Sequence, residues 1–219
     1  MTGRTLPPLL REVPSPAVAG RVSPARRGLD VVASSIGLVV LAPVFVAVAA
    51  AVRVTSRGPV IFHQTRLTTG RRQFTMYKFR TMRVAAAGPE LTAKGDTRVT
   101  RIGSVLRRTS LDELPQLVNV LRGEMTLVGP RPETAALAGR YPAHLQWVLD
   151  CTPGLTGPSQ VRLRDRAELP DAMADPETWY LEHLVPARVE TDLSYLSSPS
   201  LGATLRLLGE TVRYLMSRG

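Results

Sequence analysis

Two adjacent carboxylates, Asp112 and Glu113, are the residues of this sequence best suited to carry out a reaction. They follow the cations Arg107 and Arg108, whose charges can compensate the mutual repulsion of two neighbouring acids. A carboxylate can act as a nucleophile and form an acyl phosphate. Its neighbour can hold a divalent ion, which for a diphosphate substrate would most naturally be Mg²⁺. The pair is therefore compatible with phosphoryl transfer.

The same two acids also have a purely structural interpretation. Ser110 is a good N-cap residue, and Glu113 stands three positions later, where a capping box would place it. Acids at the start of a helix also interact favourably with the helix dipole. This structural use of an Asp-Glu pair is more common than catalysis, so the two residues alone leave both interpretations open.

Positive charge is concentrated in one part of the chain. The net charge is +10, and residues 53–108 hold thirteen Lys or Arg residues against only Glu90 and Asp96. A basic block beside a membrane segment attracts anionic lipid headgroups, or phosphorylated substrates that reach that surface. Four cations are candidates to bind a transferring phosphoryl group, namely Lys78, Arg80, Arg107 and Arg131.

Several other classes of site are disfavoured by what the sequence contains. Nucleic-acid binding is not expected, because the aromatic side chains on which bases stack are scarce, with Phe74, Tyr77 and Phe79 as the only cluster. The sequence has no Walker loop, no Rossmann glycine fingerprint and no His-Glu-x-x-His motif. Three dispersed histidines and the single Cys151 make no zinc site. One cysteine also excludes an internal disulfide and fits a reducing compartment.

An apolar segment from Leu29 to Val52, interrupted by Asp30 and by Pro43, is long enough to cross a bilayer as a helix. Arginines flank both of its ends, and cationic flanks favour the cytoplasmic side. Since proline removes a helical hydrogen bond, we expect the helix to bend at Pro43 and return to the same face. A spanning helix with a tolerated proline kink is the alternative. A cleaved signal peptide fits less well.

The remaining segments suggest a mobile tail followed by a small mixed domain. Residues 1–25 contain five prolines and little apolar periodicity. We expect two short strands, at Pro59–Phe62 and Phe74–Phe79, with a polar turn between them at Thr68–Arg72. We expect helices at Thr100–Arg108, Ser110–Leu121, 171–196 and 201–216. The last helix carries a stripe of Leu201, Leu205, Leu208, Val212 and Leu215, which we assign to the membrane interface in preference to the core.

Three runs of sequence together resemble the bacterial sugar transferases, the small monotopic polyprenol-phosphate phosphoglycosyl transferases. They are YKFRTM (Tyr77–Met82), GDTRVTRIGSVLRRTSLDELPQLVNVLRGEMTLVGPRPE (Gly95–Glu133) and PGLTGP (Pro153–Pro158). The likeness extends from about Arg27 to about Tyr214. It implies transfer of a sugar-1-phosphate from a nucleotide diphosphate sugar to a polyprenyl phosphate such as undecaprenyl phosphate, as the first membrane step of exopolysaccharide or glycoconjugate synthesis.

The resemblance also implies roles for individual residues. Asp112 matches the family's nucleophile, which forms a covalent phosphosugar intermediate, and Glu113 matches the residue that holds Mg²⁺. Lys78, Arg107 and Arg131 match basic positions of the family's active site. Asp96, Arg98 and Thr100 match a family motif whose expected role is to shape the site. Family members share a proline-kinked re-entrant helix, but commonly with Ser-Pro where this chain has Ala42-Pro43.

These observations predict a mostly helical α/β protein associated with the membrane. We expect a cytoplasmic tail (1–25), a re-entrant membrane helix (26–54) and a catalytic domain with interfacial helices (55–219) on the cytoplasmic face of the inner membrane. The expected partners are a nucleotide diphosphate sugar, polyprenyl phosphate and membrane lipid, with a homodimer left open. The rival interpretations are a membrane-tethered anion-binding protein and a catalytically silent scaffold.

Overall fold

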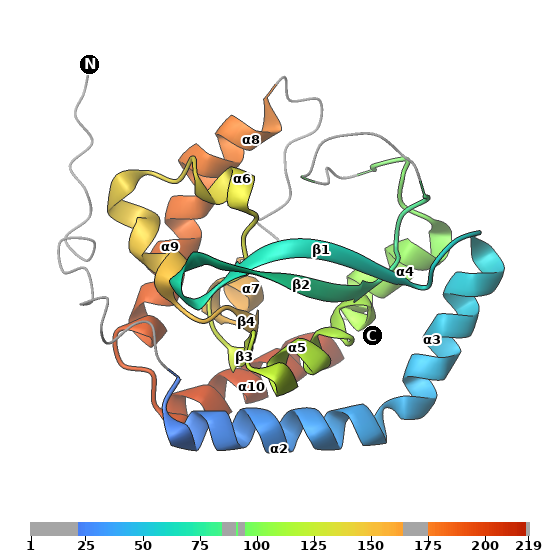
Figure 1. Ribbon diagram of the computed structural model, residues 1–219, viewed down its shortest axis with the longest axis horizontal. Coiled ribbons are helices and arrows are strands. Elements are labelled where there is room, and N and C mark those ends of the chain that lie inside the picture. Colours follow the sequence, from blue (N-terminus) through green and yellow to red (C-terminus); the bar gives the residue numbers. More distant parts are fainter. Residues whose placement is uncertain (1–21, 85–90, 92–94, 164–174, 218–219) are drawn as a thin grey trace.

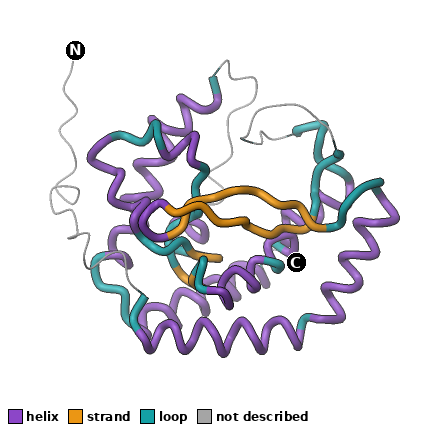
Figure 2. The backbone as a smooth tube through the Cα atoms, in the orientation of Figure 1, coloured by secondary structure: helices purple, strands orange, loops and turns teal. Residues whose placement is uncertain are grey.

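The computed structural model describes residues 22–84, 91, 95–163 and 175–217. It confirms a mostly helical fold with two small sheets (Figures 1 and 2). Most of the expected tail lies outside the described residues, and the first of the described helices begins at Pro24, within the expected tail. The α-helices are α2 (Pro24–Val40), α3 (Ala42–Thr55), α4 (Arg101–Thr109), α5 (Gln116–Arg122), α6 (Ala135–Ala138), α7 (Pro158–Arg162), α8 (Pro176–Trp179), α9 (Val185–Leu196) and α10 (Leu201–Met216).

Four strands, three 3₁₀ turns and one π-helical turn are the other elements of the described residues. The strands are β1 (Ile61–Thr68), β2 (Arg72–Phe79), β3 (Thr126–Val128) and β4 (Gly154–Thr156). The 3₁₀ turns are η2 (Thr69–Arg71), η3 (Leu111–Glu113) and η4 (Ala143–Asp150), and η6 (Tyr180–Leu184) is a π-helical turn.

Helices α2 and α3 form a bent pair that runs along the edge of the molecule (Figure 1). The break falls at Leu41, whose backbone leaves the helical region, and Pro43 lies in the first turn of α3. Among the described helices none alone is long and apolar enough to cross a membrane, whereas α2 and α3 meet that criterion together, with a bend of 61°. The expected break at the proline is therefore confirmed.

Polar residues at the start of α2 attach this helix to strand β3. The carboxylate of Asp30, which is only 1% exposed, accepts hydrogen bonds from the Leu127 amide at 2.9 Å and from the Thr126 hydroxyl at 2.8 Å. Arg26 Nη2 donates to the carbonyl of Val128 at 2.8 Å. A charge within an apolar segment is costly unless it has such partners. Asp30, which interrupts the apolar segment, is thus a docking residue.

Strands β1 and β2 form an antiparallel hairpin around the turn η2. The first strand is longer than the expected Pro59–Phe62, because it pairs with β2 along its whole length, from Ile61 opposite Phe79 to Thr68 opposite Arg72. Most of the β1 side chains are exposed or half-buried, so apolar patterning could not reveal this extension.

The parallel pair β3 and β4 brings two glycines close together, Gly154 at the start of β4 and Gly129 just after β3. A Cβ on Gly154 would lie 2.0 Å from the amide nitrogen of Gly129, so both backbones need glycine at this crossing. The main hydrophobic core surrounds this pair and includes buried residues of α5, η4 and α9 such as Val120, Leu145 and Val185. The core therefore supports the segment that leaves β3 at Gly129.

Helix α10 follows the expected boundaries and has two unlike faces. Thr204 and Leu207 are buried, whereas Leu201, Leu205 and Val212 are 41%, 52% and 56% exposed. The alternative assignment of the apolar stripe to the core is wrong for these three residues. Exposed apolar side chains also mark α2 and α3, at Val32, Ile36, Val39, Val40, Val46 and Val54.

Candidate active site

The two acids lie in a turn between helices and not at the start of one. Thr100 caps α4, since its hydroxyl accepts a hydrogen bond from the Gly103 amide at 3.0 Å. Helix α4 ends at Ser110, whose backbone is left-handed (φ 60°, ψ 13°) and whose side chain makes no capping hydrogen bond. The capping box predicted for Ser110 and Glu113 is therefore wrong. Asp112 and Glu113 belong to the 3₁₀ turn η3, and α5 begins only at Gln116, after Pro115.

Asp112 is a buried carboxylate, only 7% exposed, in a predominantly cationic environment. Burial, followed by repulsion from Glu113, raises the pKa of Asp112 above its ordinary value of 3.8. Lys78, Arg107 and Arg131 oppose this rise by attraction. The site thus holds a carboxylate that water solvates poorly and that three cations stabilise in its charged form.

Glu113 is held from two directions by cations. Its Oε1 accepts a hydrogen bond from Lys78 Nζ at 2.9 Å and lies 3.5 Å from Arg131 Nη1. Lys78 comes from β2, and Arg131 comes from the segment that follows β3. Burial lowers the pKa of Lys78, and attraction by Glu113 works in the opposite direction. Three chain segments therefore converge on one carboxylate.

A second group of predicted residues lies on the α4 side of the site. Arg107 Nε donates to the Thr81 hydroxyl at 2.9 Å, and burial lowers the pKa of Arg107 while Asp112 and Asp96 oppose that shift. Asp96 pairs with Arg98, with Nη2 2.6 Å from Oδ2, and this pairing lowers the pKa of Asp96. These contacts tie Asp96 and Arg98 to each other, and Thr100 to the start of α4.

Arg80, the fourth predicted phosphate ligand, points elsewhere. Its guanidinium donates to the carbonyl oxygen of Ser56 at 2.8 Å and also to that of Pro59. These contacts join the end of α3 to the start of β1. The structure therefore does not bring Arg80 into the group formed by the two acids, Lys78 and Arg131.

The two acids suit the way in which proteins usually hold Mg²⁺. The described residues contain no group of three or more metal-ligating side chains. Mg²⁺ commonly takes only one or two carboxylates and completes its octahedron with water and substrate phosphates. Asp112 and Glu113 supply two neighbouring carboxylates of this kind in η3.

Two buried polar residues near the site were not singled out from the sequence. Asn119 on α5 is fully buried, accepts a hydrogen bond from the Tyr77 amide at 3.1 Å and donates one to the Thr75 carbonyl at 2.7 Å. These bonds attach α5 to β2, the strand that carries Lys78.

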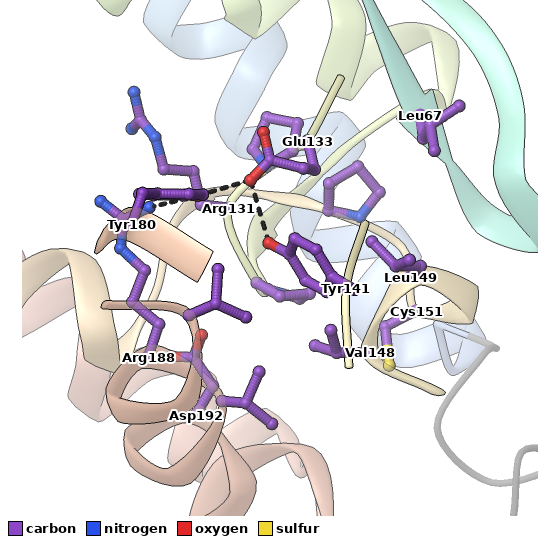
Figure 3. Close-up of a pocket in the computed structure, with 15 residues that line it drawn as sticks. Leu67, Arg131, Glu133, Tyr141, Val148, Leu149, Cys151, Tyr180, Arg188 and Asp192 are labelled. Atoms are coloured by element: carbon purple, nitrogen blue, oxygen red, sulfur yellow. Dashed lines mark hydrogen bonds between the residues drawn. The ribbon is translucent and has the colours of Figure 1, made fainter. Parts of the chain in front are cut away.

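The second residue, Glu133, accepts hydrogen bonds from Tyr141 and Tyr180 (Figure 3). The available signal for Glu133 was an acid directly after the Gly-Pro-Arg-Pro run.

Comparison with known proteins identifies relatives over nearly the whole chain. The model of the family described as "Bacterial sugar transferase" matches residues 21–218. The UDP-glucose:undecaprenyl-phosphate glucose-1-phosphate transferase of Caulobacter vibrioides is 39% identical over 93% of this chain and 73% of that protein. The exopolysaccharide production protein PSS of Rhizobium leguminosarum bv. phaseoli is 36% identical over 89% of this chain and 96% of that protein.

A third relative is longer than this chain. The UDP-N-acetylgalactosamine-undecaprenyl-phosphate N-acetylgalactosaminephosphotransferase of Aeromonas hydrophila is 32% identical over 88% of this chain. The chain spans 44% of the length of that protein.

Proposed function

Since this chain belongs to the bacterial sugar transferase family, we propose that it moves a sugar-1-phosphate from a UDP-sugar to undecaprenyl-type polyprenyl phosphate. The names of the Caulobacter and Aeromonas relatives describe transfers of this kind. The observation that carries the proposal is Asp112, a buried carboxylate with Lys78, Arg107 and Arg131 acting on its charge. A poorly solvated carboxylate among cations is suited to attack phosphorus in an anionic substrate.

The proposed reaction has two displacement steps at the same phosphorus atom. In the first, an Asp112 carboxylate oxygen attacks the sugar-bearing phosphorus, the bond from this phosphorus to the bridging oxygen breaks, and uridine monophosphate leaves. In the second, a phosphate oxygen of the polyprenyl phosphate attacks that phosphorus, the acyl phosphate bond breaks, and Asp112 returns as a free carboxylate. Each step needs cations around the phosphoryl oxygens, a role that we assign to Lys78, Arg107 and Arg131, whose charges act on Asp112.

We assign Mg²⁺ to the two acids, with Glu113 as its principal protein ligand. When bound, the ion neutralises the diphosphate oxygens and so makes the nucleotide a better leaving group. Lys78 and Arg131 hold the Glu113 carboxylate in place by their contacts to Oε1.

The bent pair α2 and α3 supports a re-entrant arrangement at the cytoplasmic face of the inner membrane. Exposed apolar side chains cover the outward face of both helices, and arginines lie at both ends of the pair. A site held at the interface meets a nucleotide sugar from water and an acceptor phosphate at the headgroup level. Single cysteines at the exposed positions Ala25 and Arg57 should both react with a membrane-impermeant thiol reagent only after the cytoplasmic side is opened, whereas a spanning arrangement predicts opposite sides.

Release of uridine monophosphate tests the proposed activity directly. Detergent-purified protein is incubated with a panel of UDP-sugars, polyprenyl phosphate and Mg²⁺, beside Asp112→Asn and the control Asp150→Asn, which alters an acid paired with Arg71. We expect release by the wild type and the control, and none by Asp112→Asn. No release from any donor by a folded wild-type protein would favour a scaffold or an anion-binding protein.

A further inference from the structure

Glu133 is a buried carboxylate, 5% exposed, at the end of the Gly-Pro-Arg-Pro segment. Its Oε2 accepts hydrogen bonds from the hydroxyl of Tyr141, at 2.9 Å, and from that of Tyr180. Its Oε1 accepts one from Arg66 Nη1 at 3.1 Å. Figure 3 marks the hydrogen bonds from both tyrosines to this carboxylate with dashed lines. One side chain thus collects donors from β1, from the chain before η4 and from η6.

The backbone at Glu133 is anchored as firmly as its side chain. Its carbonyl oxygen accepts a hydrogen bond from the Leu67 amide of β1 at 2.8 Å. On the other side of the network, Arg188 Nη1 on α9 donates to the Tyr180 hydroxyl at 2.9 Å. The chain that follows Arg131 is therefore connected to the hairpin and to the C-terminal helices at once.

The segment is fixed at its beginning by a different set of contacts. The Gly129 amide donates to the Thr156 carbonyl at 2.9 Å, and the Gly154 amide donates to the Pro130 carbonyl at 2.8 Å. Arg131 lies between these backbone contacts and Glu133. Its guanidinium is 3.5 Å from Glu113, and its charge interacts with Glu113 and Glu133.

The cavity beside this network does not suggest a substrate pocket. It has a volume of about 30 Å³ and is bordered by Arg131, Glu133, Tyr141, Tyr180 and Arg188 among other residues. This space suits one or two water molecules. Among the polar residues around it, Glu133 bonds to both tyrosines and Tyr180 to Arg188, and the charge of Glu133 acts on Arg131.

A purely structural role explains Glu133 poorly. A buried carboxylate loses its hydration, and apolar residues of similar size often replace a buried ion pair without loss of stability. Arg131, by contrast, has a long and flexible side chain that must stay beside Glu113, and small displacements of a positioning group reduce catalysis strongly.

We propose that Glu133 is a positioning residue, which through Tyr141 and Tyr180 holds the segment so that the Arg131 guanidinium stays beside Glu113. This inference rests on the proposed function, in which Arg131 binds the transferring phosphoryl group. It adds the C-terminal elements η6 and α9 to the parts of the chain on which catalysis depends.

Tyr180→Phe tests the proposal, because it removes only the hydroxyl that bridges Glu133 and Arg188. Tyr195→Phe is the control, since Tyr195 is also 4% exposed and its hydroxyl also forms a buried hydrogen bond, with Thr204 at 2.8 Å. Tyr180→Phe should lose more thermal stability than this control, because the Tyr180 hydroxyl bonds two charged partners and that of Tyr195 bonds one neutral partner. We expect kcat/KM for the donor to fall about tenfold in Tyr180→Phe and less than about twofold in Tyr195→Phe.

A double-mutant cycle with Arg131→Ala separates positioning from a general loss of folding. The effect of Tyr180→Phe should disappear once Arg131 is absent, because nothing remains for the network to position. Equal losses of kcat/KM in Tyr180→Phe and Tyr195→Phe would overturn the proposal. So would a Tyr180→Phe effect that persists undiminished in the Arg131→Ala background.

A second measurement does not depend on turnover. Crystal structures of the wild type and of Glu133→Gln should show the Arg131–Glu113 contact in the first and its loss in the second. An unchanged contact would overturn the inference. A wild-type protein that transfers no sugar phosphate would count against the proposed function alone, and the two structures would still decide the role of Glu133.

Discussion

Lys78 on β2 and Glu113 on η3 form an ion pair across 35 positions of the chain, with 2.9 Å between Nζ and Oε1. The side chains of the two residues are 15% and 23% exposed, so water screens the pair only in part. The hairpin and the turn after α4 therefore meet at the candidate active site through a charged contact.

Replacement of Lys78 should damage catalysis more than folding. Lys78→Met removes a cation that stabilises both Asp112 and Glu113, and loss of one such group typically lowers kcat by about 10²–10³-fold. Lys78→Arg should retain part of the activity. Arg72→Met, at an exposed position of the same strand, should stay within about twofold of the wild type. Steady-state release of uridine monophosphate measures all three, and full activity in Lys78→Met would contradict the assignment.

Gly103 on α4 should tolerate no side chain. A Cβ at this position would lie 2.0 Å from the carbonyl oxygen of Thr81, so Gly103→Ala must push α4 away from the end of β2. Because Arg107 lies one turn later on the same helix and contacts Thr81, we expect loss of most activity, measured by uridine monophosphate release.

Gly209→Ala provides the control for that substitution. Gly209 also lies within a helix, and no atom would contact its Cβ within 4 Å. The helix propensity of alanine should then stabilise the protein by about 0.5–1 kcal/mol with activity unchanged. Similar activities of the two variants would show that the contact between Gly103 and Thr81 does not position Arg107.

Asn119 should be a stability determinant with an indirect effect on the site. Asn119→Ala leaves the Tyr77 amide and the Thr75 carbonyl without this buried partner, and an unsatisfied buried polar group costs about 1–3 kcal/mol. We expect the free energy of unfolding to fall by about 2–4 kcal/mol in denaturant titrations. Gln116→Ala, another buried polar position on α5, should cost less, because its Nε2 atom makes no hydrogen bond among the described residues.

Local features of the sequence predicted several parts of this structure. Pro43 breaks the first apolar segment because proline has no backbone N–H to donate to the preceding turn of a helix. This effect is local and does not depend on the surrounding fold. The 3.6-residue pattern of the last helix and the Thr100 start of α4 were likewise visible in short windows. Charge alone made Lys78, Arg80, Arg107 and Arg131 candidates, and the family resemblance supported the grouping of Lys78, Arg107 and Arg131 with the two acids, because residues this distant in sequence carry no local sign of contact.

The errors arose where tertiary contacts decide the outcome. Ser110 has the composition of an N-cap, but the chain turns through a left-handed backbone there and delivers Asp112 to the interior. Arg80 has the same residue type as its neighbours in the basic block, yet its guanidinium is taken by the carbonyls that end α3. The partners of Glu133 come from residues up to 67 positions away. Residue type alone could not distinguish these roles.

The acid limb of the pH–rate profile should report Asp112. Burial and Glu113 raise its pKa, and an attacking carboxylate must be deprotonated, so kcat/KM should fall as pH decreases through a value above 3.8. Lys78→Met removes an attraction that stabilises the charged form of Asp112 and should move this limb to higher pH. A limb that stays in place or moves to lower pH in Lys78→Met would exclude Asp112 as the titrating group.

Asp192 on α9 should make the stability of the fold depend on pH. Asp192 is 2% exposed, its Oδ1 accepts a hydrogen bond from the Ser159 amide at 2.8 Å, and burial raises its pKa from 3.8 to about 7. Between pH 3.8 and about 7, Asp192 therefore binds a proton more tightly in the native state than in the unfolded chain. Stability from this group is fully present below pH 3.8 and decreases by up to about 1.4 kcal/mol per pH unit as pH rises towards 7.

Asp192→Asn should remove this dependence, because asparagine keeps an acceptor for the Ser159 amide and cannot ionise. The variant should unfold at a higher temperature than the wild type at pH 8 and at a similar temperature at pH 4. Ser159→Ala, which removes the hydroxyl bonded to Oδ2 at 2.9 Å, should be less stable than the wild type at both pH values. Thermal unfolding from pH 4 to 8 measures the difference, and parallel curves for the wild type and Asp192→Asn would show that Asp192 does not titrate in this range.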